Sequence, residues 1–154
     1  MIWMPSINTI LKGAGEILQL GPIQARVLED GSRTDDRIGA VEITVPPKTV
    51  QTPQHLHRMH DETFLVTCGT VRFTFSGADH DLHAGDYVVV PTGASHTFSN
   101  PFDETAVFFN SFTPAYYVNY LRELATLSSK GDLSQEVILK AMARYATEPA
   151  GRSD

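Results

Sequence analysis

Apolar and polar residues alternate along the first three quarters of the chain. The alternation is clearest in residues 41–45 and 71–75, where every second residue is Val, Ile or Phe. This two-residue period indicates half-buried strands. Further strands are predicted at 24–28, 62–68, 87–90, 96–99 and 105–112, each bounded by Gly, Pro, Asn or Asp. Many short strands at even spacing favour an all-β fold, either a closed barrel or a sandwich.

The period changes to a helical one after Phe112. Tyr117, Leu121 and Leu124 recur at helical spacing, and Thr113 could cap a helix whose first residue is Pro114. A second helix is predicted from near residue 132, where an Asp followed three residues later by Gln resembles a capping box. We therefore expect C-terminal helices that cover one end of the barrel.

These patterns predict a single domain over residues 1–154. Its barrel core spans about residues 20–112, and a helical appendage follows over about 113–146. The ends, residues 1–8 and 147–154, carry no pattern and are expected to be frayed. The length suits one domain with its own hydrophobic core.

Composition and charge narrow the function classes. With 42% hydrophobic and 19% charged residues, the chain is typical of a globular protein. Its net charge of -6 repels a phosphate backbone, so nucleic acid is not an expected partner. No leader-like segment and no run of 18 apolar residues occurs, so we expect no membrane association and a cytoplasmic location. The single cysteine, Cys68, excludes an intramolecular disulfide and is expected to be a small buried residue within a strand.

Four residues carry the candidate chemistry: His55, His57, Glu62 and His96. Imidazole nitrogen and carboxylate oxygen together suit one divalent transition metal, and four protein donors can leave positions open for water or substrate. Residues 55 and 57 point to one side of a strand because side chains alternate. Pairing of the strand that His96 begins beside the first one would place its imidazole opposite them.

The residues around these four resemble the two conserved motifs of the cupin superfamily. The run from His55 to Glu62, followed by Gly69, is similar to the first motif, and the run from Gly85 to Asn100 is similar to the second. Thr49 stands where the first motif normally begins with glycine. The wider pattern resembles small single-domain cupins grouped with quercetin 2,3-dioxygenases.

This resemblance implies a double-stranded β-helix, the jelly-roll barrel of the cupins, with a metal in its mouth. It implies that His55, His57, Glu62 and His96 are metal ligands and that Glu62 can also accept a proton from substrate. The implied cofactor is one divalent metal, Fe first, with Mn, Ni, Zn, Co or Cu as alternatives. The leading hypothesis is a dioxygenase-like enzyme that acts with dioxygen on a small enolisable or phenolic molecule.

Two alternatives stay open at this stage. A metal-dependent isomerase or lyase without oxygen would need a further base, for which Tyr87 and His60 are candidates. A non-catalytic module that binds a small molecule or a metal is the other. His60 is expected at the rim or surface, and His80 and His83 beside a surface turn. A homodimer is the default expectation for the oligomeric state.

Overall fold

The computed structural model describes residue 2 and residues 4–151 of the chain. The strands and helices, in chain order, are β1 (Ile17–Leu20), β2 (Ile23–Asp30), β3 (Gly39–Val45), β4 (His55–His57), β5 (Asp61–Cys68), β6 (Thr70–Phe75), β7 (Ala78–His83), β8 (Tyr87–Val90), β9 (Thr97–Ser99), β10 (Ala106–Thr113), α1 (Tyr117–Ser129), α2 (Gln135–Arg144) and β11 (Thr147–Pro149).

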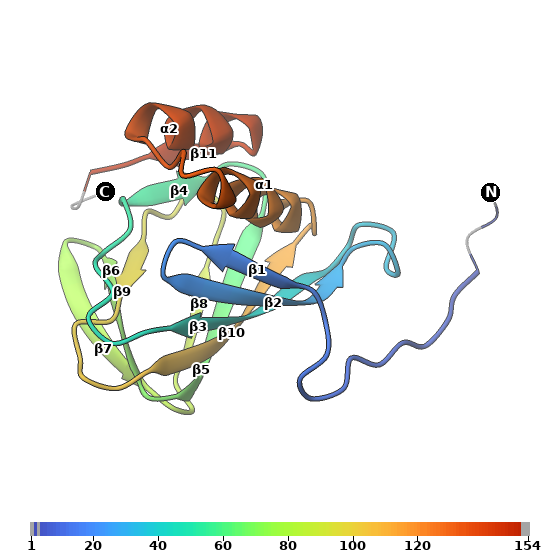
Figure 1. Ribbon diagram of the computed structural model, residues 1–154, viewed down its shortest axis with the longest axis horizontal. Coiled ribbons are helices and arrows are strands. Elements are labelled where there is room, and N and C mark those ends of the chain that lie inside the picture. The colour runs from blue at the N-terminus through green and yellow to red at the C-terminus, as the bar shows by residue number, and fades with distance from the viewer. Residues whose placement is uncertain (1, 3, 152–154) are drawn as a thin grey trace.

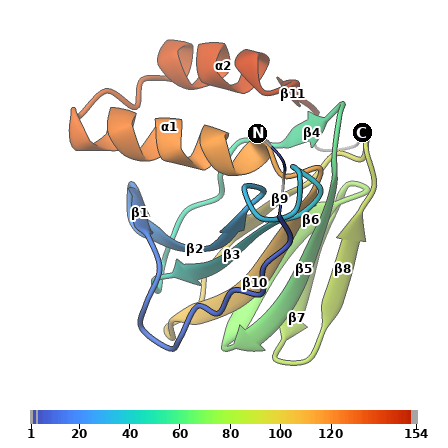
Figure 2. The same cartoon turned by 90° about the vertical axis from the view of Figure 1, so that its right-hand side faces the viewer.

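The strands form a barrel of antiparallel sheets. Six strands pair in the order β1-β2-β3-β10-β5-β8, three in the order β7-β6-β9, and β4 pairs with β11. The two helices lie together across one end of the barrel, with α1 next to β1 and β2 (Figures 1 and 2). The all-β barrel with C-terminal helices predicted from the sequence is therefore confirmed.

The barrel core follows from the two-residue alternation. On β10, every second residue from Ala106 to Phe112 is buried, and its neighbours are half-buried. The Phe108 ring lies 5.4 Å from that of Phe64 and 6.0 Å from that of Phe73, measured between centroids. Aromatic side chains bury large apolar areas, so this cluster stabilises the barrel. The strands of the barrel also carry the inward-facing polar residues.

Both helix starts differ from those predicted. Thr113 pairs with Asp61 as the last residue of β10, so it cannot cap a helix, and α1 begins only at Tyr117. At α2 the cap is Ser134, whose hydroxyl accepts a hydrogen bond from the backbone of Val137. The backbone N–H of Asp132 instead donates to Leu127 and closes the end of α1.

Three further expectations are corrected by the structure. Residues 78–83 form strand β7 rather than a turn, and His80 stacks on Phe75 with centroids 4.0 Å apart. Cys68 is exposed at the end of β5. At the C-terminus, residues 147–149 form β11, although residues 152–154 lie outside the described part of the chain.

At the N-terminus, residues 1 and 3 also lie outside the described residues, and the remainder of the first eight forms no regular element. In the described part of the chain, neither helix has the length and apolar character that a membrane crossing requires.

The aromatic core predicts a contrast between two neighbours on β10. Phe108→Ala should lower the free energy of unfolding by roughly 3–5 kcal/mol, since it empties a fully buried site. Phe109→Ala removes the same atoms from the half-buried face and should cost less than half as much. Urea unfolding of both variants measures the difference, and equal losses would contradict the assignment of the inner face.

Candidate metal centre

Strand β4 carries two candidate ligands, one at each end, and pairs with His96 and with β11. Its first residue, His55, forms an antiparallel bridge with His96 through two backbone hydrogen bonds of 2.9 and 3.1 Å. Its last residue, His57, pairs with Thr147 of β11. The distant histidine is therefore fixed opposite β4 by main-chain pairing, as the sequence predicted.

Glu62 approaches the same point from the start of β5. One carboxylate oxygen, Oε2, lies 3.0 Å from Nε2 of His57 and 3.1 Å from Nε2 of His96. All three residues are buried, with exposed fractions of 2% to 4%. Three of the four candidate ligands predicted from the sequence are thus brought together.

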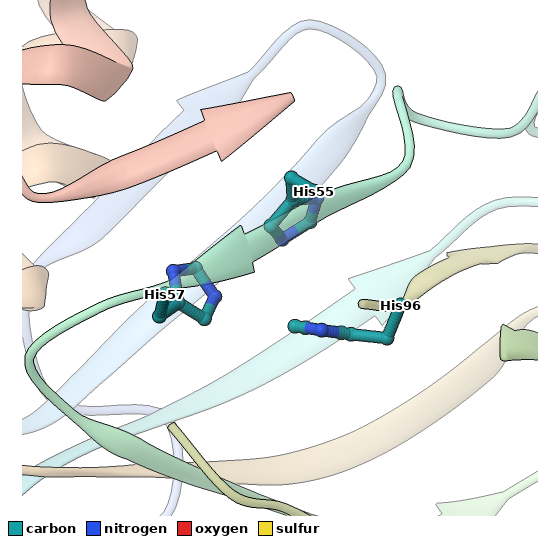
Figure 3. Close-up of side chains that lie close together, drawn as sticks. All are labelled: His55, His57 and His96. Atoms are coloured by element: carbon teal, nitrogen blue, oxygen red, sulfur yellow. The ribbon is translucent and has the colours of Figure 1, made fainter. Parts of the chain in front are cut away.

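The imidazole of His55 completes the group. Its ring centroid lies 4.9 Å from that of His57 and 4.6 Å from that of His96. Figure 3 shows the two β4 histidines side by side, with the His96 ring extending toward them from the opposite segment. One nitrogen of each of these three histidines lies within 4.8 Å of the others, which is close enough for a single ion to hold all three.

Hydrogen bonds on the outer ring nitrogens fix the orientation of the histidines. Nδ1 of His55 donates to the carbonyl of Pro53 at 2.8 Å, and Nδ1 of His96 donates to that of Ala94 at 3.2 Å. A carbonyl can only accept, so the proton of each neutral ring sits on Nδ1. The Nε2 lone pairs are consequently free for a metal, which is the usual arrangement of metal-binding histidines.

His57 reaches the same state through a hydroxyl. The Thr147 hydroxyl donates to the carbonyl of Tyr145 at 3.1 Å, so it can accept the Nδ1 proton of His57 at 2.9 Å. Nε2 of His57 then presents a lone pair to the Glu62 carboxylate, and neither atom can donate a hydrogen to the other. Nε2 of His57 has no hydrogen-bond partner among the described residues.

The site's charges follow from burial and proximity. Desolvation, together with the nearby imidazoles of His96 and His57, lowers the pKa of His55 to about 3. Burial alone would raise the pKa of Glu62, but a proton carried on Nε2 of His57 or His96 would donate to the carboxylate and bring a positive charge beside it, which outweighs burial and holds that pKa well below its usual value. A neutral imidazole and an ionised carboxylate are the forms that bind metals.

These residues fit a divalent metal. Two Nε2 lone pairs directed at one buried carboxylate oxygen repel one another unless a cation lies between them. A metal ion bound by His55, His57, His96 and Glu62 would satisfy all of these acceptors at once.

His60 is not at the surface, as the sequence suggested, but 1% exposed beside His57. The two rings lie 4.1 Å apart between centroids. Nδ1 of His60 bonds the Tyr116 hydroxyl at 2.9 Å, and its Nε2 has no partner in the described structure. With His57 and Glu62 it forms a second group whose ligand atoms lie within 4.8 Å of one another. The turn before β5 breaks the strand alternation, which is why the sequence pattern misplaced it.

Two supporting residues escaped sequence reasoning. Asn110 donates to the other carboxylate oxygen of Glu62 at 3.1 Å and to the Thr63 carbonyl at 3.0 Å. The sequence could have indicated a role for Asn110, because it is the one polar residue on the inward side of β10, between Phe108 and Phe112. Thr147 gave no such signal, since it lies in a segment without periodicity.

The site opens onto a cavity of about 300 Å³. His55, Glu62, His96 and Asn110 form its polar end. The other lining residues come from the β1–β2 turn, residues 49–53, the barrel wall and the C-terminal segment: Leu20, Gly21, Pro22, Ile23, Ile43, Thr49, Val50, Gln51, Thr52, Pro53, Phe64, Phe98, Tyr117, Tyr120, Leu121, Leu124, Leu133, Ile138, Met142 and Thr147. A structural metal site is closed by its ligands, whereas this one has room beside it.

Comparison with known proteins agrees with the fold and the motifs. A family model described as a cupin domain matches residues 41–112. An uncharacterized protein of Aquifex aeolicus is 36% identical over 69 residues, which are 45% of this chain and 55% of that protein. The chain thus matches only about half the length of this relative.

Several solved structures share the fold over most of the chain. KdgF from a Halomonas species has a TM-score of 0.62 at 17% identity, covering 71% of this chain and 94% of its own. An RmlC-like cupin from Shewanella frigidimarina has a TM-score of 0.61 at 24% identity, covering 71% and 93%. A sugar phosphate isomerase of the cupin superfamily from Silicibacter pomeroyi has a TM-score of 0.55 at 24% identity, covering 61% and 60%. At these identities the likeness shows the fold alone.

The barrel is therefore the double-stranded β-helix of the cupins, with two helices added at its C-terminal end. The matched cupin domain covers residues 41–112, just under half of the chain, and the solved structures share its fold. In this chain the C-terminal segment covers the barrel mouth, and its Thr147 hydroxyl bonds Nδ1 of His57.

The Thr147 hydroxyl predicts a role for β11 in metal affinity. Thr147→Val keeps the shape but removes the acceptor for the His57 proton, so affinity for the metal should fall about 10- to 100-fold. Thr147→Ser should retain most of it. Competition with a coloured chelator measures the affinity, with Thr67→Val on the exposed end of β5 as the control. Wild-type affinity in a folded Thr147→Val protein would contradict this role.

Proposed function

We propose that this protein is a mononuclear metal-dependent enzyme that acts on a small enolisable or phenolic molecule, with dioxygen as second substrate. The proposal rests on one observation: candidate metal ligands form part of the lining of a cavity. Three of the four candidate metal ligands, His55, Glu62 and His96, line a cavity large enough for a small organic molecule. A substrate oxygen in this cavity could reach the metal position.

When bound, the metal would supply Lewis acidity, which lowers the pKa of a coordinated hydroxyl and stabilises the resulting oxyanion. The chain's own residues prepare the site for this. Main-chain carbonyls orient His55 and His96, and the Asn110 amide holds one oxygen of Glu62 while the other faces the histidines. Preorganised ligands of this kind need little rearrangement when substrate binds.

The proton-accepting role implied for Glu62 remains a proposal. The carboxylate lines the cavity, which favours it, but its lowered pKa makes it a weak base while both histidine contacts persist. We therefore propose metal ligation as its main role. Proton transfer to Glu62 would require loosening of one of those contacts.

The residues that line the cavity give less support to an isomerase or lyase that works without oxygen. Tyr87 is 58% exposed on the edge strand β8, and neither Tyr87 nor His60 belongs to the residues that line the cavity. An isomerase or lyase that used either as a second base would need them in contact with substrate. Turnover of the same substrates without oxygen would favour this alternative.

The metal assignment predicts the behaviour of two histidine variants. His96→Ala removes the ligand delivered from across the barrel and should abolish metal retention after purification and dialysis. His83→Ala, at an exposed position, should retain one metal per chain. Inductively coupled plasma mass spectrometry measures both, and full metal content in His96→Ala would contradict the site.

The reaction class is tested on the metal-loaded protein. The Fe, Mn and Ni forms should be assayed in an oxygen electrode with flavonols, catechols and β-diketones, and at least one form should consume oxygen with one of these classes. The His96→Ala protein should consume none. A fully loaded protein that takes up no oxygen with any of them would overturn the dioxygenase proposal but leave the metal site standing.

A further inference from the structure

The cavity beside the metal centre is lined mainly by apolar side chains. Three candidate metal ligands, His55, Glu62 and His96, lie in the lining together with Asn110. The β1–β2 turn and the two helices contribute apolar lining side chains, among them Leu20, Leu124, Ile138 and Met142. Leu124, Ile138 and Met142 belong to α1 and α2, which lie across this end of the barrel (Figure 2).

The wall carries no positive charge. Within the described set of lining residues there is neither a lysine nor an arginine, and Glu62 is the one carboxylate. A phosphate or a second carboxylate on the ligand would therefore lie against apolar side chains without a counter-ion, which is costly. Burial raises the pKa of Tyr120 to about 12, so its hydroxyl stays neutral.

The wall also offers few hydrogen-bonding groups to a polyhydroxylated ligand. The Thr49 hydroxyl already donates to the Pro46 carbonyl at 2.7 Å. The Thr52 and Thr97 hydroxyls bond each other at 2.7 Å. Besides the candidate ligands and Asn110, the Gln51 amide and the Tyr117 and Tyr120 hydroxyls are the main side-chain groups left for a polyhydroxylated ligand. Several of its hydroxyls would therefore lose water without gaining a partner, and each unpaired group lowers affinity.

We propose that the ligand of this centre has one oxygen-containing head group that binds the metal and an uncharged, apolar body that fills the space under α1 and α2. This rests on the proposed function, because the head group needs the metal. The volume of about 300 Å³ lies at the lower end of ligand pockets and limits the body to a small alkyl or aryl group. Sugar phosphates and dicarboxylates are excluded as ligands of this cavity.

A series of alkyl hydroxamates tests the inference. These probes keep one chelating head group while the chain grows from two to four, six and eight carbons. Binding to the metal-loaded protein is measured by isothermal titration calorimetry, with metal content checked afterwards. Affinity should rise by up to about fourfold per buried methylene and level off once the cavity is full. Affinity that stays flat or falls with chain length would overturn the inference, as would tighter binding of a sugar phosphate or oxalate than of the longest probe.

Two adjacent residues of α2 provide a matched pair of variants. Ile138 lines the cavity, whereas Leu139 is 38% exposed and is not among the lining residues. Ile138→Gln should reduce the affinity gain with chain length and leave the two-carbon probe unchanged, while Leu139→Gln should change neither. Equal effects of the two substitutions, or no effect of either one, would contradict the placement of the ligand body under α2.

Failure of this inference and failure of the proposed function are distinguishable. If the two-carbon probe binds only to the metal-loaded protein but chain length has no effect, the metal centre stands and the apolar ligand class is wrong. If every probe binds metal-free and metal-loaded protein alike, the metal-dependent function is wrong. Because the series is run on the wild-type protein, neither result depends on whether a variant folds.

Discussion

The site depends on one electrostatic constraint, the burial of two histidine nitrogens against a single carboxylate oxygen. Nε2 of His57 and Nε2 of His96 lie 3.0 and 3.1 Å from Oε2 of Glu62, with water largely excluded. With their outer nitrogens already donating, neutral rings present lone pairs to a negative charge. The contact is favourable only with a cation, either a proton on one imidazole or a metal ion shared by all the groups.

The barrel is organised around this constraint. Main-chain pairing between β4 and His96 fixes two ligands across a short distance, and β11 supplies the hydroxyl that orients the third. The helices then cover the mouth with apolar side chains, which excludes water and leaves a cavity beside the ligands. Low local dielectric strengthens the attraction between these ligands and a metal, so the covering segment contributes to binding as well as to shape.

Much of this could be predicted from the sequence, because strands and motif spacings are local properties. The alternation in residues 41–45 and 71–75 predicted a closed barrel or a sandwich, and the motifs around His55, His57, Glu62 and His96 indicated the jelly-roll barrel and four candidate metal ligands. Helix starts were less predictable, because Thr113 is held in β10 by pairing with Asp61, a contact made across the fold. Tertiary pairing overrode a good local capping signal.

The rest of the site lay beyond sequence reasoning for similar reasons. His60 stands in a turn where the strand period gives no direction, and only the packing of Tyr116 and His57 around it shows that it is buried. Thr147 reaches His57 across 90 residues of chain. The character of the cavity depends on which helix faces turn inward, and that follows from the docking of α1 and α2 on the barrel.

The most direct measurement is the protonation pattern of the histidine rings in the zinc-loaded protein, read by nitrogen-15 nuclear magnetic resonance. The arrangement described here predicts a proton on Nδ1 of His55, His57 and His96 and a metal-bound, proton-free Nε2 on each. A proton on Nε2 of His57 or His96 in the zinc-loaded protein would contradict it.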